Sequence, residues 1–152
     1  IPLCLVGSEM CIRDSSRIAL GETRGGADDF KIFLDTGSLG LILDLGWCGG
    51  LTEARRCAAL ASSYQTPVAA HDCNGPVVLT ASVHFCQSTK NAYVQEIVRA
   101  FYYGWYDEIV TNLPPIKNGE ITIPDGPGLG LELRNDFKKR NTTFSRISKY
   151  KS

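Results

Sequence analysis

The sequence predicts an α/β fold built from about four consecutive βα units, and three observations support this prediction. Four short apolar runs each finish in a single ionisable residue. The runs are residues 17–22, 39–44, 67–71 and 92–96, which end in Glu22, Asp44, His71 and Glu96. These end residues lie 22, 27 and 25 positions apart, a spacing that accommodates one strand and one crossover helix. The segments between the runs have helical patterns. Because the runs are continuously apolar, we expect a parallel sheet that is buried on both faces.

The intervening segments are predicted to be helices. A Gly25-Gly26 turn precedes the first, over residues 28–36, and Gly37 is placed to end it. The second covers residues 51–65 and carries an apolar stripe of helical period, which consists of Ala54, Cys57, Ala58, Ala61 and Tyr64. Pro76 suits the first turn of the third helix, which continues over residues 77–86. The fourth, residues 97–110, contains the unfavourable Gly104.

Strands that alternate with helices, each strand ending in an acid, a base or a ligand, are typical of a (β/α)-barrel. In such barrels the catalytic side chains come from several strand ends on one face. An open, doubly wound sheet gives similar local patterns, so periodicity alone leaves both architectures open.

The two ends of the chain differ from this central part, and we expect one domain over residues 16–133. Residues 1–15 have neither an initiator methionine nor the features of a signal peptide, and they resemble translated adapter sequence. We expect them to be non-native or disordered. Asn118-Gly119 predicts a closing hairpin, and residues 124–130 form a turn-rich segment. Residues 134–152 are expected to be a charged, frayed tail.

Composition gives no indication of nucleic acid or an anionic membrane as the main partner. The 16 basic residues balance the 16 acidic ones, so the formal net charge is zero, which gives nucleic acid and anionic lipid no electrostatic attraction. No apolar run approaches the roughly 20 residues of a membrane span. The six cysteines show no CxxC pair, so we expect reduced thiols and a cytoplasmic location.

Five stretches resemble the mandelate racemase and muconate lactonizing enzyme family of the enolase superfamily, especially its acid-sugar dehydratases. They are LGETRGG (20–26), LDLGWCGGLTEAR (43–55), PVAAHDCNGP (67–76), NAYVQEIVRAFYYGWY (91–106) and NGEITIPDGPGLGLEL (118–133). The order and spacing of the four strand-end residues give the resemblance its specificity. It implies the C-terminal part of a (β/α)7β barrel with a closing hairpin segment.

The resemblance also implies a Mg²⁺ cofactor and the roles of four residues. In the family, three carboxylates on consecutive strands hold the ion, which stabilises the enediolate formed when the α-proton of a carboxylate substrate leaves. Glu22 matches the third of these ligands, while the first two and a Lys-x-Lys pair belong upstream of this sequence. His71 and Asp44 match a catalytic dyad. Glu96 matches a carboxylate that hydrogen-bonds the substrate carboxylate or the enediolate.

Structural explanations of the same residues stand beside these roles. Glu22 could interact with the dipole of a helix starting near Ala27, Asp44 could cap the following loop, and His71 could be a satisfied strand-end histidine. A buried Glu96 without a partner would be costly, which favours function. We expect His84 to be structural, the loop near Cys73 to be shaped by Asp72, Cys73 and Cys48, and the aromatic residues of 101–106 to pack against a helix.

The leading functional hypothesis is dehydration of an acid sugar of the aldonate, aldarate or tartrate type, with a homo-oligomer as the complete protein. A racemase, epimerase or cycloisomerase on the same scaffold is the nearest alternative. Enzymes of another class would use Cys73 or Cys48 as a nucleophile with His71, or bind zinc through His71, Cys73 and Cys48. The last alternative is a non-catalytic fragment that lacks half the active site. We expect the isolated chain to be inactive and poorly soluble because it has exposed sheet edges.

Overall fold

The computed structural model describes residues 18–144, 146, 148 and 149. The expectation for residues 1–15 lies outside this part of the chain.

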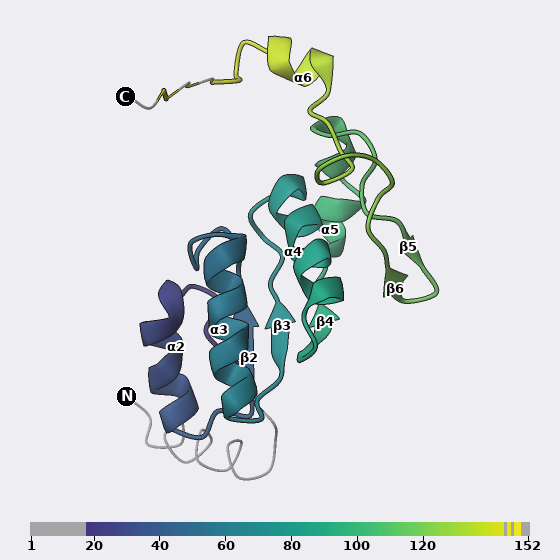
Figure 1. Cartoon of the computed structure of the whole chain (residues 1–152). Helices are drawn as coiled ribbons and strands as arrows, with labels where there is room; N and C mark the ends of the chain where they lie inside the picture. The colour runs from purple at the N-terminus through teal and green to yellow at the C-terminus, as the bar shows by residue number, and fades with distance from the viewer. Residues whose placement is uncertain (1–17, 145, 147, 150–152) are drawn as a thin grey trace, which may run out of the picture.

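Four parallel strands form the central sheet, in which they follow the same order as in the sequence (Figure 1). They are β1 (Ala19–Leu20), β2 (Gly40–Leu43), β3 (Val68–Ala70) and β4 (Ala92–Gln95). Each lies inside one of the four apolar runs, so the strand prediction is confirmed. The order does not reverse, as it would at the switch point of a doubly wound sheet. The sheet therefore has the topology of a barrel segment.

Three helices connect the strands and cover one face of the sheet (Figure 1). They are α2 (Gly26–Asp35), α3 (Leu51–Ser63) and α4 (Pro76–Ser88), and each begins within two residues of its predicted start. Right-handed crossovers put successive helices on the same side of a parallel sheet. None of the helices in the described residues has the length and hydropathy of a membrane span.

The main hydrophobic core lies between these helices and the two central strands. Its fully buried side chains include Phe30, Leu41, Leu43, Ala54, Cys57, Ala61, Val68, Ala70 and Phe85. The outer strands are less covered, because each pairs with one neighbour only in the described sheet. On β4, Tyr93 is 64% exposed and Val94 is 46% exposed. Burial on both faces is therefore confirmed for β2 and β3 but not for β4.

Residues 97–110 do not form the single helix that we expected. The structure has one helical turn, α5 (Arg99–Tyr102), and a separate 3₁₀ turn, η1 (Tyr106–Glu108). The backbone of Val98 is extended, with φ −79° and ψ 96°, and its N–H donates to Oδ2 of Asp72 at 2.9 Å. At Gly104, an added Cβ would lie 2.2 Å from the carbonyl oxygen of Ala100. The long-range hydrogen bond from Val98 to Asp72 overrides the local helical pattern.

The closing hairpin is confirmed. Strands β5 (Ile116–Lys117) and β6 (Glu120–Ile121) pair in an antiparallel manner. Between them, Asn118 and Gly119 have φ values of 53° and 81°, the left-handed backbone that a two-residue hairpin loop requires. The turn-rich residues 124–130 contain no helix or strand.

The charged tail contains a short helix, α6 (Asn135–Lys139), that the sequence did not indicate. Just before it, the Nε of Arg134 donates to the carbonyl of Val110 at 3.1 Å, and the backbone N–H of Arg134 donates to the carbonyl of Ile109 at 2.9 Å. The start of the tail is thus attached to the segment after η1. The domain bounds at residues 16 and 133 stay a prediction.

Candidate active site

The side chains that follow the four strands converge on His71. Asp44, His71 and Glu96 come directly after β2, β3 and β4, and Glu22 lies two residues beyond β1. The backbone N–H of His71 still donates to the carbonyl of Leu43, at 2.9 Å. Parallel strands end at the same edge of a sheet, which explains why residues far apart in the sequence meet here.

The two ring nitrogens of His71 face different carboxylates. Nδ1 lies 2.8 Å from Oδ2 of Asp44. Nε2 lies 3.8 Å from Oε2 of Glu22 and 3.6 Å from Oε2 of Glu96. The Asp44 side chain is fully buried, whereas those of Glu22 and Glu96 are 55% and 49% exposed. A ring held on one side by a buried carboxylate and accessible on the other has the geometry of a general acid or base.

The Asp44 carboxylate holds the following loop as well as the histidine. Its Oδ1 accepts hydrogen bonds from the N–H of Gly46 at 2.7 Å, from the N–H of Trp47 at 3.1 Å and from Nδ2 of Asn74 at 2.7 Å. Oδ2 is left for His71. The loop-capping and dyad interpretations of Asp44 are therefore compatible, with one oxygen serving each.

Asn74 is a site residue that the sequence argument missed. It lies in the loop between β3 and α4, and its amide donates to Oδ1 of Asp44, the same oxygen that accepts from the N–H of Gly46. The sequence could have indicated this role, because Asn74 lies three residues after the strand-end histidine and just before Gly75-Pro76. An amide can reach back from that loop to an acid on the neighbouring strand.

Among the described residues, the first turn of α2 makes no hydrogen bond to Glu22. The N–H of Ala27, in the first turn of α2, instead donates to Oε1 of Glu53 at 3.0 Å. Glu53 lies in the first turn of α3, and no local pattern linked it to the earlier helix. The carboxylate of Glu22 faces His71 instead.

Glu96 is half exposed, so the premise that this side chain is buried was wrong. Strand β4 is an edge of the described sheet, which leaves its carboxyl end open to solvent. Oε2 of Glu96 accepts a hydrogen bond from the N–H of Asp72 at 3.3 Å. Its position near Nε2 of His71 now supports a functional role in place of burial.

Asp72, buried beside the histidine, organises the loop after β4. Its Oδ1 accepts from the hydroxyl of Tyr106 at 2.8 Å and its Oδ2 from the N–H of Val98 at 2.9 Å. Burial raises the pKa of Asp72 above the ordinary range, although these two hydrogen bonds counteract the rise. Burial and the bond to Asp72 raise the pKa of Tyr106. Asp72 thus shapes the loop after β4, a different loop from the one near Cys73 for which the sequence predicted this role.

Tyr106 and His84 have packing roles. Tyr106 is fully buried against Leu79 and Val83 of α4, and its ring lies 4.8 Å from that of Trp105. Nε2 of His84 lies 3.2 Å from the carbonyl oxygen of Leu129, so this histidine joins α4 to the turn-rich segment. Both observations agree with the structural interpretations from the sequence.

The cysteines near His71 do not have the environment of nucleophiles. Burial raises the pKa of both Cys73 and Cys48, and the charge of Asp44 raises both further. A reactive cysteine needs the opposite, a lowered pKa that maintains the thiolate. The nucleophilic alternative is therefore disfavoured.

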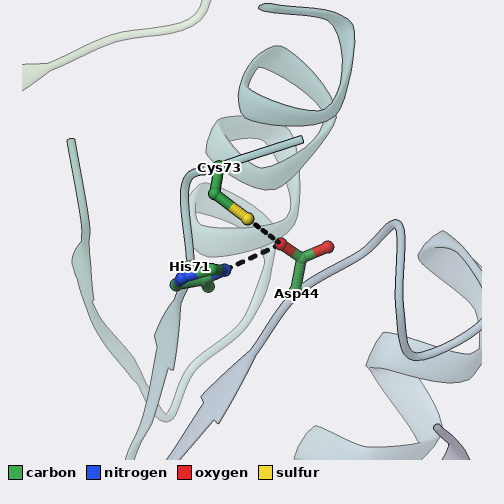
Figure 2. A group of neighbouring side chains, drawn as sticks. All are labelled: Asp44, His71 and Cys73. Atoms are coloured by element: carbon green, nitrogen blue, oxygen red, sulfur yellow. Dashed lines mark hydrogen bonds and ion pairs between the residues drawn. The ribbon is translucent and has the colours of Figure 1, made fainter. Parts of the chain in front are cut away.

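One group of three possible metal ligands occurs among the described residues, and it consists of Asp44, His71 and Cys73 (Figure 2). Cys48 is buried and does not belong to it. The group offers oxygen, nitrogen and sulfur, whereas Mg²⁺ prefers oxygen ligands alone. Glu22 fits a magnesium site better, because it offers a half-exposed carboxylate at the strand-end face.

Comparisons with known proteins agree with this arrangement. A family model described as enolase C-terminal domain-like matches residues 9–137. A D-galactonate dehydratase from Pectobacterium atrosepticum is 32% identical over 128 residues, which cover 79% of this chain and 33% of that protein. A D-xylonate dehydratase from Haloferax volcanii is 37% identical over 93 residues, which cover 61% of this chain and 22% of that protein. The chain thus spans a third or less of these relatives.

Solved structures show the same fold. An enolase of the mandelate racemase subgroup from Agrobacterium tumefaciens has 50% sequence identity and a TM-score of 0.75, with 82% of this chain and 34% of that chain covered. An enolase protein from environmental sequencing of the Sargasso Sea has 36% identity and a TM-score of 0.78, with 89% and 36% covered. The chain therefore belongs to the enolase C-terminal domain-like family, within the mandelate racemase branch of the enolase superfamily.

Proposed function

We propose that this chain supplies the C-terminal part of the active site of an acid-sugar dehydratase. The observation that carries the proposal is the placement of His71, with Nδ1 against the buried Asp44 and Nε2 between the exposed Glu22 and Glu96. The names of the relatives, D-galactonate and D-xylonate dehydratase, favour elimination of water over racemisation.

In the proposed reaction, a base from elsewhere in the complete enzyme accepts the α-proton of a sugar acid to give an enediolate, which then expels the β-hydroxyl group as water. His71 donates a proton from Nε2 to the departing hydroxyl, and Asp44 stabilises the imidazolium through Nδ1. Glu96 would hydrogen-bond the substrate carboxylate, which it can do as a donor only in its protonated form.

Glu22 would contribute one oxygen ligand to Mg²⁺. A bound Mg²⁺ supplies positive charge that offsets the negative charge of the enediolate. The group of three possible metal ligands among the described residues does not include Glu22, so the other magnesium ligands would come from elsewhere in the complete enzyme. For this reason we expect the isolated chain to show no turnover.

We also propose that the complete enzyme is a cytoplasmic homo-oligomer. The four described cysteines, Cys48, Cys57, Cys73 and Cys86, are all free thiols, which suits a reducing compartment. Sedimentation of the complete enzyme would determine its oligomeric state.

The proposal is tested by parallel measurements of Mg²⁺ affinity and of D-galactonate and D-xylonate turnover in the complete enzyme. The His71→Asn variant should lose about 10²–10⁴ in turnover, the usual contribution of a general acid or base, while Mg²⁺ affinity stays nearly unchanged. Asp44→Asn should also lower turnover, because the charge that supports the imidazolium is removed. Glu22→Gln should weaken Mg²⁺ binding first and lose activity as a result.

His84→Asn is the matched control, since His84 is the other histidine and lies away from the strand ends. It should keep both activity and metal affinity. Full activity of His71→Asn, or loss of its Mg²⁺ binding, would leave the dyad without support.

A further inference from the structure

We propose that Asp44, His71 and Cys73 form a second cation site, for a thiophilic divalent ion such as Zn²⁺, which takes the dyad out of use when it is filled. An ion can bind to this site whether or not the proposed function is correct. The expected inhibition rests on the proposed function, because it requires that His71 and Asp44 act in catalysis. The site is distinct from the magnesium position proposed at Glu22, because Glu22 does not belong to this group of three ligands.

The three donor atoms are already close together (Figure 2). Oδ2 of Asp44 lies 2.8 Å from Nδ1 of His71 and 3.9 Å from Sγ of Cys73, and all three atoms lie within 4.8 Å of one another. Zinc bonds of about 2.0–2.3 Å in tetrahedral geometry place two ligand atoms roughly 3.3–3.8 Å apart. The observed separations lie on both sides of that range, so a small shift of the histidine ring and the thiol completes the geometry.

The Asp44 carboxylate is held in the orientation that such a site needs. Three donors, the N–H groups of Gly46 and Trp47 and the amide of Asn74, occupy Oδ1. The carboxylate therefore cannot rotate without losing these bonds, and Oδ2 remains directed at His71 and Cys73. Fixed orientation of a ligand by outer hydrogen bonds is how proteins commonly strengthen a metal site.

The local charge and access also favour a cation. The carboxylates of Glu22 and Glu96 lie within 4 Å of the other ring nitrogen of His71, so a divalent ion would enter negative surroundings. Cys73 is exposed, which gives an ion a route from solvent and leaves a fourth position for water. Nitrogen and sulfur ligands favour Zn²⁺ over Mg²⁺.

Binding changes the protonation of the dyad in a defined way. The thiol of Cys73 releases one proton to solvent as its sulfur binds the ion. For a neutral imidazole that carries its proton on Nδ1, that proton leaves Nδ1 and one is taken up at Nε2, so the ring stays neutral. The cation is then balanced by the thiolate and by the Asp44 carboxylate. The hydrogen bond between Asp44 and His71 is lost, and the neutral, ion-bound ring can no longer form the imidazolium that donates a proton to the departing hydroxyl.

The test is a Co²⁺ titration of the reduced, metal-free 152-residue chain at low concentration, followed by displacement with Zn²⁺. We expect one equivalent of Co²⁺ to bind, with a thiolate-to-cobalt charge-transfer band. Zn²⁺ should abolish the band, and a large excess of Mg²⁺ should not. Cys73→Ser should lose the band and weaken Zn²⁺ binding by roughly tenfold or more, at least the loss seen for outer-shell substitutions.

Cys48→Ala is the matched control, because Cys48 is the other nearby cysteine but does not belong to the group. It should retain the band. A second measurement needs no variant: Zn²⁺ should slow alkylation of Cys73 in the unaltered chain, as followed by mass spectrometry. The proposal would be overturned if the band persisted in Cys73→Ser, or if Zn²⁺ failed to slow alkylation of Cys73. It would also be overturned if Cys48→Ala lost the band while its circular dichroism spectrum stayed unchanged.

Discussion

The buried hydrogen bond between Tyr106 and Asp72 should contribute strongly to stability, and the Tyr106→Phe variant tests this. The hydroxyl lies 2.8 Å from Oδ1 of Asp72, and both side chains are almost completely buried. A hydrogen bond to a charged group contributes about 1.5–3 kcal/mol. After the substitution Asp72 keeps the N–H of Val98 as a donor. We therefore expect Tyr106→Phe to lower the free energy of unfolding by about 2 kcal/mol at pH 7.

Tyr64→Phe provides a matched control for this substitution. The Tyr64 hydroxyl donates to Asp35 at 2.7 Å, but this pair is exposed to solvent. Water replaces the lost bond there, so the unfolding midpoint should hardly change. Urea unfolding followed by tryptophan fluorescence suits both variants, because the ring of Trp105 lies 4.8 Å from that of Tyr106.

The pH dependence separates a charged hydrogen bond from simple loss of packing. The bond from Tyr106 lowers the pKa of Asp72, which burial raises, so Tyr106→Phe should raise that pKa further. A carboxyl group with a raised pKa in the folded state stabilises the fold below its unfolded pKa and loses this contribution as pH rises. The loss of unfolding free energy caused by Tyr106→Phe should thus be largest near neutral pH and become smaller in acid. The reasoning would be refuted if Tyr106→Phe and Tyr64→Phe lost equal free energies of unfolding. It would also be refuted if the loss in Tyr106→Phe did not depend on pH.

Two further predictions concern the backbone near α5 and the buried thiols. Gly104→Ala should destabilise the chain by about 1–3 kcal/mol, because the added Cβ would clash with the carbonyl oxygen of Ala100. Gly25→Ala is the control in the same urea assay, because a Cβ at Gly25 would make only ordinary van der Waals contacts. Burial raises the pKa of Cys57 to about 12 and that of Cys86 to about 11, from 9.0. Both thiols stay protonated in the folded state after they ionise in the unfolded one, so the free energy of unfolding should fall as pH rises from 9 towards these values. The double substitution to alanine should flatten that slope, and an unchanged slope would contradict the assignment.

The sheet and its first three helices could be predicted because each element carries its own local signal. Continuous apolar runs marked the strands, and a stripe such as that of Ala54, Cys57 and Ala61 marked the buried side of α3. The strand-end position of His71 then implied its proximity to Asp44, since neighbouring parallel strands end together. The hairpin at Asn118 was predictable because the turn requires a particular backbone conformation.

Other features depended on contacts between distant segments. The helix expected over residues 97–110 breaks because Val98 and Tyr106 both bind the buried Asp72, and no pattern within that segment reveals this partner. The exposure of Glu96 follows from the edge position of β4. The bond from Asn74 to Asp44 joins residues 30 positions apart. Such interactions depend on how the loops fold over the sheet, which periodicity does not describe.

The position of each strand in the sheet divides the candidate site into two parts with different local stability. Asp44 and His71 follow β2 and β3, which have strand neighbours on both sides, whereas Glu22 and Glu96 follow β1 and β4, which have one each. Local opening reaches edge strands at a lower free energy than central ones. Amide hydrogens of β2 and β3 should therefore exchange with solvent much more slowly than those of β1 and β4. In the isolated 152-residue chain, His71 and Asp44 should keep their geometry while the carboxylates of Glu22 and Glu96 fluctuate around them.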